Sequence, residues 1–277
     1  MIISKKIINN YGAMINDHLR NAWFKKHIHA TVKNKVFADI GFGTGILSAY
    51  AIEAGAKHGY AIENNKEAFT CGKYLLDQLG YKNKITFINN EFQSADLSGV
   101  EVVIADQVGP ALFDQLQIDI WKKAGAFCIP HYISIPDEIG VDLYVFNGSI
   151  PNIDNALIDN SILPNGFYSA ISKISICPVK VIENIISVTA DTVNQPLEFQ
   201  LDLTEFSSVT LVFVNKIGFQ KDYLYLNQST TQNWQFPPRL YIDNCTKPIK
   251  ICWDATISNL ENPDDGQYCG YWIVEEI

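Results

Sequence analysis

The chain has 277 residues, of which 47% are hydrophobic and 12% aromatic, enough for the core of one large domain or of two ordinary ones. Its formal net charge of -9 excludes a general electrostatic attraction to nucleic acid or to an anionic membrane surface. No window approaches an apolar span of about 18 residues. We therefore expect neither a nucleic acid nor a membrane among its partners.

The cysteines bear on the compartment of the protein. None of the six forms a C-x-x-C pair, and none has a metal-ligand spacing to the five histidines, so we expect no metal site. The first residues, M-I-I-S-K-K-I-I, lack the apolar core of a signal peptide. These features predict a reducing compartment and a cytoplasmic location.

Residues 1–35 are predicted to form one or two helices that lead into the first strand. Apolar residues recur there at helical intervals, at Ile15, Leu19, Ala22 and Trp23. Asp17 and Arg20 lie between them, three positions apart. On a helix surface this spacing is typical of an ordinary ion pair, which contributes only tenths of a kcal/mol.

Residues 36–48, V-F-A-D-I-G-F-G-T-G-I-L-S, predict a strand, a tight turn and the start of a helix. Glycines occupy alternate positions of the turn, at Gly41, Gly43 and Gly45. Such spacing lets the backbone turn sharply and approach a ligand closely, while the free amides of the following helix face that ligand. The stretch therefore predicts a site for a nucleotide-like molecule.

Strands and helices alternate from residue 36 to about 140, which predicts a mostly parallel α/β sheet. Strands are expected at V-F-A-D-I, H-G-Y-A-I-E, K-I-T-F-I, E-V-V-I-A-D and A-F-C-I-P, with a later one at V-D-L-Y-V-F. Helices are expected at 46–54, at 65–79 and at about 110–124, before Gly125. Asp39, Glu63 and Asp106 each end a predicted strand, so we expect all three to face one crevice at the carboxyl edge of the sheet.

After Pro136 the sequence consists of strand-like runs separated by turn residues, with almost no helical periodicity. This pattern predicts a second, all-β domain, either a barrel or a sandwich. The expected organisation is a helical leader over 1–35, a Rossmann-like domain over 36–147 and a β-barrel-like domain over 148–277.

The G-x-G-x-G turn, with Asp39 before it and Glu63 after the second strand, resembles motif I of the class I S-adenosyl-L-methionine (SAM)-dependent methyltransferases. In that family the first acid orders the turn and the second binds the ribose. The order of a leader helix, a SAM-type α/β domain and a C-terminal β-domain resembles the protein arginine N-methyltransferases.

Two further segments carry the resemblance to the cofactor site of this family. M-I-N-D-H-L-R (14–20) resembles an M-x-x-D-x-x-R helix whose arginine, here Arg20, pairs with the carboxylate of SAM. N-N-E-F-Q-S-A-D-L (89–97) resembles the adenine-binding segment, which implies the Phe92 backbone and the Gln93 side chain at the purine edge. The family usually has glutamate where Gln93 stands, and an amide oxygen can still accept from the exocyclic amine.

The acceptor site of the family is less closely matched. Its loop carries two glutamates that hold the substrate guanidinium, whereas this chain reads A-D-Q-V-G-P-A-L-F-D-Q-L over 105–116. Asp106 stands for the first glutamate, and Gln115, with Asp114 beside it, falls near the second. Asp114 is equally well interpreted as a solvated residue early in a helix.

The C-terminal domain matches the family pattern in one further segment, and the chain departs from that pattern in two others. T-Q-N-W-Q (231–235) resembles the T-H-W loop, with Asn233 in place of the histidine that meets the leader aspartate, here Asp17. Trp234 is kept, although a lone tryptophan in a β-domain is more often a core residue than a site residue. The aromatic Y-F-x-x-Y lid is absent from the first residues, and the dimerisation arm is shortened around 148–172, which leaves the oligomeric state open.

The resemblance implies a SAM-dependent N-methyltransferase that transfers a methyl group to a guanidino nitrogen of arginine, with S-adenosyl-L-homocysteine as product and no metal. The acceptor is either an arginine in a protein or a small guanidino or amino compound. The alternative is a catalytically weakened, SAM-binding scaffold subunit. Methylation of nucleic-acid bases is disfavoured, because A-D-Q-V-G-P stands where an N-P-P-[YF] signature is expected.

Overall fold

The computed structural model describes residues 5–108, 115–148, 178–192, 198–226, 239–254 and 271–277. The chain divides into two compact units. The first comprises Met1–Gln107, Leu116–Asp137 and Gly218–Asp222. The second comprises Val108–Gln115, Glu138–Ile217 and Tyr223–Ile277. The expected boundaries at 35 and 147 stay predictions.

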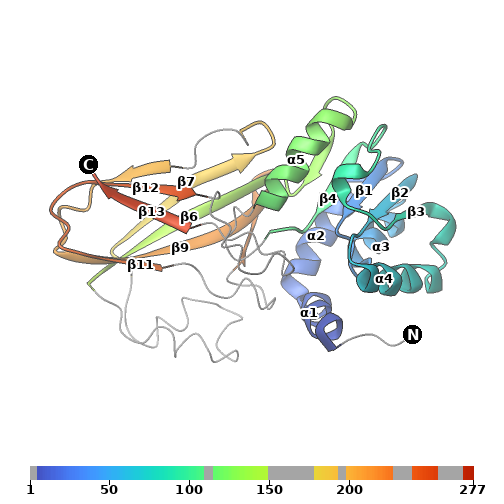
Figure 1. Cartoon of the computed structure of the whole chain (residues 1–277), viewed down its shortest axis with the longest axis horizontal. Coiled ribbons are helices and arrows are strands. Elements are labelled where there is room, and N and C mark those ends of the chain that lie inside the picture. The colour runs from blue at the N-terminus through green and yellow to red at the C-terminus, as the bar shows by residue number, and fades with distance from the viewer. Residues whose placement is uncertain (1–4, 109–114, 149–177, 193–197, 227–238, 255–270) are drawn as a thin grey trace. The chain divides into compact units, whose positions relative to one another are not determined.

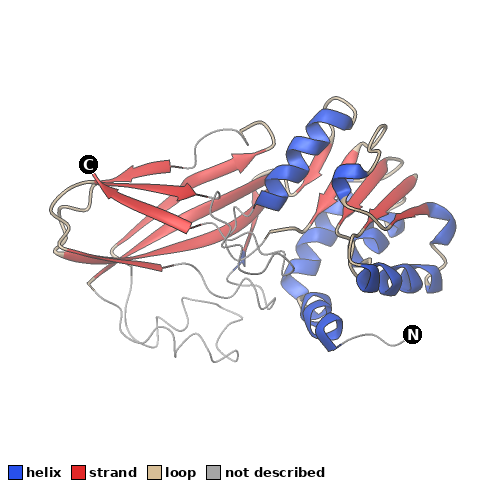
Figure 2. Cartoon of the chain, in the orientation of Figure 1, coloured by secondary structure: helices blue, strands red, loops and turns tan. Residues whose placement is uncertain are grey.

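The first unit is built on a five-stranded parallel sheet with the order β3-β2-β1-β4-β5 (Figures 1 and 2). Its strands are β1 (Val36–Ile40), β2 (His58–Ile62), β3 (Ile85–Ile88), β4 (Val102–Ala105) and β5 (Ile133–Ile135). Its helices are α1 (Lys5–Asn16), α2 (His18–Thr31), α3 (Ile46–Glu53), α4 (Lys66–Gln78) and α5 (Gln115–Phe127), with the short 3-10 turns η1 (Lys82–Lys84) and η2 (Phe92–Ser94). The predicted Rossmann-like α/β architecture is confirmed.

The strand register sets where the site lies. Ile40 of β1 pairs with Ile62 of β2 and with Ala105 of β4. The residues that follow these three positions therefore emerge at one edge of the sheet, where ligands bind in parallel sheets. Buried apolar residues fill the layer behind this edge: Ala38, Ile40, Ile62, Phe92, Leu97, Val103, Ile120 and Ala124.

The predictions around residue 125 are wrong. Helix α5 does not end before Gly125 but runs on to Phe127, and the strand expected at A-F-C-I-P does not form. A Cβ at Gly125 would meet nothing within 4 Å, so this glycine lies on an open helix face and costs only about 1 kcal/mol of helix propensity. Burial of Ile120 and Ala124 outweighs that cost. The last strand of the sheet, β5, follows Pro130 instead.

The second unit contains two antiparallel sheets in the described part of the chain. In one the order is β10-β9-β6-β7 and β11 pairs with β9; in the other it is β13-β12-β8. The strands are β6 (Glu138–Asn147), β7 (Lys180–Thr189), β8 (Glu198–Leu201), β9 (Ser208–Phe219), β10 (Asp222–Tyr225), β11 (Arg239–Asp243), β12 (Ile249–Asp254) and β13 (Tyr271–Glu276). The all-β prediction is confirmed, although the described strands do not close into a single barrel.

The V-D-L-Y-V-F strand forms within β6, but it pairs with β7 in an antiparallel register rather than joining the parallel sheet.

None of the described helices combines the length and hydrophobicity needed to cross a membrane.

Candidate functional site

The glycine turn between β1 and α3 needs glycine at all three positions. Gly41, Gly43 and Gly45 have φ values of 71°, 51° and 81°, in the left-handed region that side chains disfavour. A side chain from another segment also lies close to each glycine, where an added Cβ would collide with it. At Gly41 the Cβ would lie 2.0 Å from Nε2 of Gln107, and at Gly43 it would lie 2.3 Å from Cε1 of Tyr11. At Gly45 it would lie 2.6 Å from Cδ1 of Leu76. The turn is therefore enclosed by side chains from three segments.

A fourth glycine, which sequence analysis missed, supports this turn from α4. A Cβ at Gly72 would lie only 2.1 Å from the carbonyl oxygen of Gly43. Helix α4 thus packs directly on the backbone of the turn. The only sequence indication was a glycine within a long helical run, which by itself says nothing about close packing.

Glu63 connects the turn to the start of α4. One oxygen of its buried carboxylate accepts from the amide of Gly43 at 3.2 Å, and the other accepts from the amide of Asn65 at 2.9 Å. Asn65 is the N-cap of α4, and its side chain accepts from the amides of Glu67 and Ala68. Burial raises the pKa of Glu63, while its bonds to backbone amides oppose that rise.

Asp39 lies one residue before the end of β1 and is buried. Its Oδ2 accepts a hydrogen bond of 2.6 Å from the hydroxyl of Ser48 in α3. Burial raises the pKa of Asp39 to about 7, even though the Ser48 bonds favour the ionised form. The side chain therefore ties the first strand to the helix that follows the turn.

Gly41 and Glu63 border an open hollow of about 350 Å³, a volume that includes space open to solvent. Its walls are Ile40, Gly41, Ile62, Glu63, Asn64, Asn90, Glu91, Phe92, Gln107 and Leu116. The predicted residues Gly41, Glu63 and Phe92 are thus brought together. Gln93 is exposed and is not part of the wall, whereas Asn64, Asn90, Glu91, Gln107 and Leu116 were not expected there.

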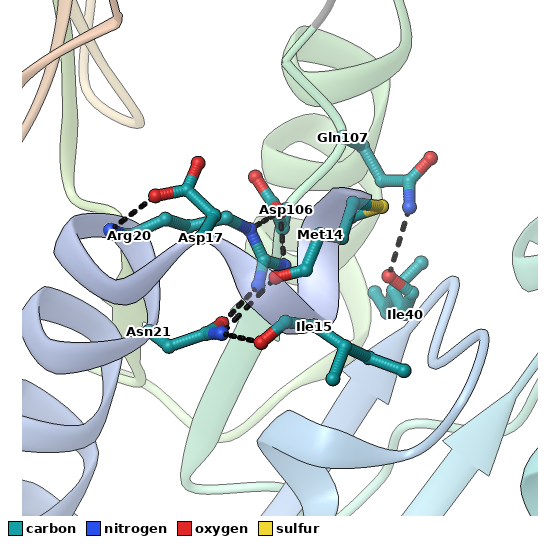
Figure 3. A network of polar contacts seen from close by, with 8 residues as sticks. All are labelled: Met14, Ile15, Asp17, Arg20, Asn21, Ile40, Asp106 and Gln107. Carbon is teal, nitrogen blue, oxygen red and sulfur yellow. Dashed lines mark hydrogen bonds and ion pairs between the residues drawn. The ribbon is translucent and has the colours of Figure 1, made fainter. Parts of the chain in front are cut away.

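Arg20 and Asp106 form a buried ion pair at the end of β4 (Figure 3). Nε of Arg20 donates to Oδ2 of Asp106 at 2.5 Å, and Nη2 contacts the same oxygen. Oδ1 of Asp106 is buried and has no hydrogen-bond partner among the described residues. Burial raises the pKa of Asp106, and Arg20 opposes that rise. The interpretation of Asp17 and Arg20 as a surface ion pair is therefore wrong.

The M-I-N-D-H-L-R segment is not one helix, because α1 ends at Asn16 and α2 begins at His18. Asp17 between them caps α2 by accepting from the amide of Arg20 at 3.0 Å. Ile15 and Leu19, which the periodicity assigned to an apolar face, are 43% and 48% exposed. The helix break turns Arg20 inward in their place.

Asn21 holds the two helices together at this break. Its Nδ2 donates to the carbonyl oxygens of Met14 at 3.0 Å and Ile15 at 2.8 Å, at the end of α1. Its Oδ1 accepts from Nη1 of Arg20 at 2.7 Å. A single buried amide therefore fixes both the end of α1 and the guanidinium (Figure 3).

Several predicted site residues cannot be placed. Asp114, Asn233 and Trp234 lie outside the described residues, as does nearly all of the shortened arm at 148–172. Gln115 begins α5, but its side chain lies outside the described part. Among the residues that the structure describes, no group of three or more His, Cys, Asp or Glu side chains is arranged to hold a metal ion.

No protein-family model matches the chain. Among curated proteins, it is 28% identical over 134 residues to protein arginine N-methyltransferase 6 of Xenopus laevis, a match that covers 44% of this chain and 39% of the relative. It is 34% identical over 112 residues to protein arginine N-methyltransferase 1 of Oryza sativa subsp. indica, covering 37% of this chain and 29% of the relative. The matches thus span well under half the length of these relatives.

Two solved structures are similar in fold to this chain over nearly its whole length. The crystal structure of PRMT6-SAH matches with a TM-score of 0.68 at 16% identity and covers 97% of this chain and 100% of that one. The Trypanosoma brucei PRMT1 enzyme-prozyme heterotetrameric complex with AdoHcy matches with a TM-score of 0.65 at 15% identity, covering 96% and 97%. This chain has the fold of the protein arginine methyltransferases. The arginine-methyltransferase fold accounts for both units, the parallel sheet with its glycine turn and the antiparallel sheets.

Proposed function

We propose that this chain is a SAM-dependent N-methyltransferase of the arginine-methyltransferase type. The observation that carries the proposal is the Glu63 carboxylate, which binds the Gly43 amide of the glycine turn beside an open hollow. A buried acid joined to such a turn at the carboxyl edge of a parallel sheet is the arrangement that binds the sugar of a nucleotide-like ligand. The similarity to arginine methyltransferases narrows that ligand to SAM.

The residues present fit this cofactor. Gly41 lines the hollow without a side chain of its own, next to Gln107, and Glu63 stands at the same wall for the ribose hydroxyls. Arg20 presents a guanidinium that is already fixed by two partners, and two of its five N–H groups, without a partner among the described residues, are proposed to bind a carboxylate. When bound, the cofactor supplies a methyl group carried by a sulfonium.

Asp106 is proposed to orient the acceptor nitrogen. Its Oδ1 is buried and unpartnered in the described structure, so it can accept from an N–H of the acceptor while Oδ2 stays bound to Arg20. Orientation of the reacting nitrogen and a local negative charge provide most of the catalysis in such a displacement. Asp114, Gln115 and Asn233 are proposed to complete this side of the site, and Asp17 holds the Arg20 backbone.

Guanidino compounds suit a carboxylate because a guanidinium is planar, stays protonated and carries five donors. The acceptor is proposed to be an arginine, either in a protein, as the names of the relatives state for those proteins, or as a free small molecule. The second candidate function, a SAM-binding scaffold, is favoured by the described part of the acceptor loop, in which Asp106 is the single carboxylate.

Two measurements test the proposal. Calorimetric titration with S-adenosyl-L-homocysteine is expected to show binding that Glu63→Ala weakens by at least tenfold. Transfer of a labelled methyl group from SAM is then measured with an arginine-rich peptide and with free arginine as acceptors. Binding that is absent or insensitive to Glu63→Ala contradicts the cofactor site. Binding without transfer to any nucleophile supports the scaffold instead of the enzyme.

A further inference from the structure

Gln107 occupies a place in the hollow that the proposed reaction does not yet use. It directly follows Asp106 after the end of β4, and it is one of the residues that line the hollow. Its side chain lies against the glycine turn, because a Cβ at Gly41 would be 2.0 Å from its Nε2. Gln107 therefore borders both the turn that is proposed to hold the cofactor and the carboxylate that is proposed to hold the acceptor.

The end of β1 sets the orientation of the Gln107 amide. Its Nε2 donates to the carbonyl oxygen of Ile40 across 3.4 Å (Figure 3). A carbonyl oxygen accepts hydrogen bonds and cannot donate them, so the nitrogen and not the oxygen of the amide faces Ile40. Oε1 points away from Ile40 and has no hydrogen-bond partner in the described part of the chain. The negative end of the amide dipole is therefore available to a ligand.

The order of the sheet indicates which part of the cofactor passes this amide. In the proposed SAM site Glu63, after β2, binds the ribose, and Arg20, bonded to Asp106 after β4, binds the carboxylate of the amino-acid part. Strand β1 lies between β2 and β4. The sulfonium joins the ribose to the amino-acid part, so it crosses the end of β1, where Gly41 and Gln107 meet.

An amide oxygen interacts differently with the two forms of the cofactor. SAM carries a positive charge on its sulfur, and this charge also polarises the C–H bonds of the methyl group. S-adenosyl-L-homocysteine has a neutral thioether at the same place. An oxygen close to the sulfonium attracts its charge and accepts from the polarised C–H groups, whereas the thioether offers it neither. A free amide oxygen at the end of β1 thus favours the methyl donor over the demethylated product.

We propose that Oε1 of Gln107 faces the sulfonium of the bound cofactor and so makes the site prefer SAM to S-adenosyl-L-homocysteine. This rests on the proposed SAM site. Methyl transfer removes the positive charge, so the attraction to Gln107 disappears when the product has to leave. Gln107 is therefore a residue that determines specificity between the donor and the spent cofactor.

The test is the ratio of the affinities for SAM and for S-adenosyl-L-homocysteine, measured by calorimetry at pH 8 with the whole chain and without an acceptor. Gln107→Leu replaces the amide by an apolar group of similar size. It is expected to shift the ratio toward the product by about fivefold to tenfold, the range of one hydrogen bond. Gln107→Glu is expected to shift the ratio toward SAM, because a full negative charge attracts the sulfonium more strongly than a dipole does.

Gln78→Leu and Gln78→Glu are the matched controls. Gln78 is an exposed glutamine at the end of α4 and does not line the hollow. The two substitutions make the same changes in side-chain chemistry and in net charge, and both are expected to keep the wild-type ratio. Thermal melting shows whether each variant is folded.

The proposal is overturned if Gln107→Leu keeps the wild-type ratio, if Gln107→Glu does not shift it toward SAM, or if the Gln78 controls shift it equally. These outcomes leave the SAM site in place as long as the wild-type protein binds both compounds. Binding of neither compound by the folded wild-type protein contradicts the SAM site itself and removes both proposals. Because the readout is a ratio of two affinities, a variant that merely loosens the turn lowers both affinities and leaves the ratio unchanged.

Discussion

Arg20 directs two nitrogens, Nε and Nη2, at the same oxygen of Asp106, which leaves the other oxygen of that carboxylate buried without a partner in the described structure. An arginine and a carboxylate usually meet with two nitrogens on two oxygens. The one-sided arrangement stabilises the charge of Asp106 through Oδ2. It also leaves Oδ1 available for the proposed methyl acceptor. The pair of Arg20 and Asp106 can therefore serve both proposed ligands, the carboxylate of SAM through Arg20 and the acceptor through Asp106.

Asp106→Asn tests this pair. The substitution leaves the buried guanidinium without its counter-charge, and we expect it to lower the free energy of unfolding by about 3 kcal/mol. We expect methyl transfer to fall by roughly 100-fold or more, because the acceptor nitrogen loses its charged partner. Urea denaturation and a labelled-methyl assay measure the two effects. Retained binding of S-adenosyl-L-homocysteine shows that the site is still folded, and unchanged transfer under that condition contradicts the proposed role.

Gly72→Ala tests the packing of α4 on the glycine turn. The new methyl group would lie 2.1 Å from the carbonyl oxygen of Gly43, so α4 and the turn must separate. We expect the free energy of unfolding to fall by about 1–3 kcal/mol and the affinity for S-adenosyl-L-homocysteine to fall with it. Gly125→Ala is the matched control, since it is also a helical glycine but faces open space. It is expected to be neutral or to stabilise by up to about 1 kcal/mol. Equal effects of the two substitutions would argue against tight packing at Gly72.

Asp39 is expected to make stability depend on pH. Its pKa in the folded chain, about 7, is above the ordinary value of 3.8, so the neutral form is favoured by folding. The resulting stability is fully present below about pH 4 and is lost as the pH rises through 7, with a slope of at most about 1.4 kcal/mol per pH unit. Asp39→Asn, which keeps an acceptor for Ser48, is expected to remove this slope. Urea denaturation between pH 4 and pH 8 compares the two proteins, and parallel curves would refute the assignment.

Tyr11 is expected to contribute to cofactor affinity. Its ring lies against Gly43, and burial together with the nearby Glu63 charge raises the pKa of its hydroxyl. We expect Tyr11→Ala to weaken binding of S-adenosyl-L-homocysteine about tenfold, because the ring no longer covers the turn, and Tyr11→Phe to weaken it much less. Tyr74→Ala, at a tyrosine of α4 that is 51% exposed, is the control. If Tyr11→Ala and Tyr74→Ala bind equally well, the ring has no such role.

The parts of the fold that could be predicted are those in which local pattern and tertiary packing agree. The β1 strand, the glycine turn and α3 follow directly from 36–48, because the backbone of that turn requires glycine wherever it occurs. The strands of the second unit were recognisable from short apolar runs between turn residues. Gly125 was misleading because an open helix face tolerates a glycine that elsewhere ends a helix.

The site was predicted less completely, because contacts between distant segments have no local pattern. Periodicity could not show that Arg20 is buried against Asp106, 86 positions away in the sequence. The same is true of Gly72 against Gly43 and of Glu91 against Asn64. The resemblance named Gln93, which is exposed and does not line the hollow, and its role as a base contact stays a prediction. Tyr11 supplies from within α1 an aromatic ring that the first residues lack.

The amide of Asn21 has a consequence for the order of events in the proposed catalytic cycle. It bonds α1 through Met14 and Ile15 on one side and Arg20 on the other. If α1 swings away to admit or release a ligand, the Asn21 bonds to the carbonyl groups of Met14 and Ile15 break, whereas the Arg20 guanidinium can stay bonded to Asp106. In the proposed enzyme, exchange at the glycine turn can then proceed while the proposed acceptor side remains assembled, so that successive turnovers do not rebuild it each time.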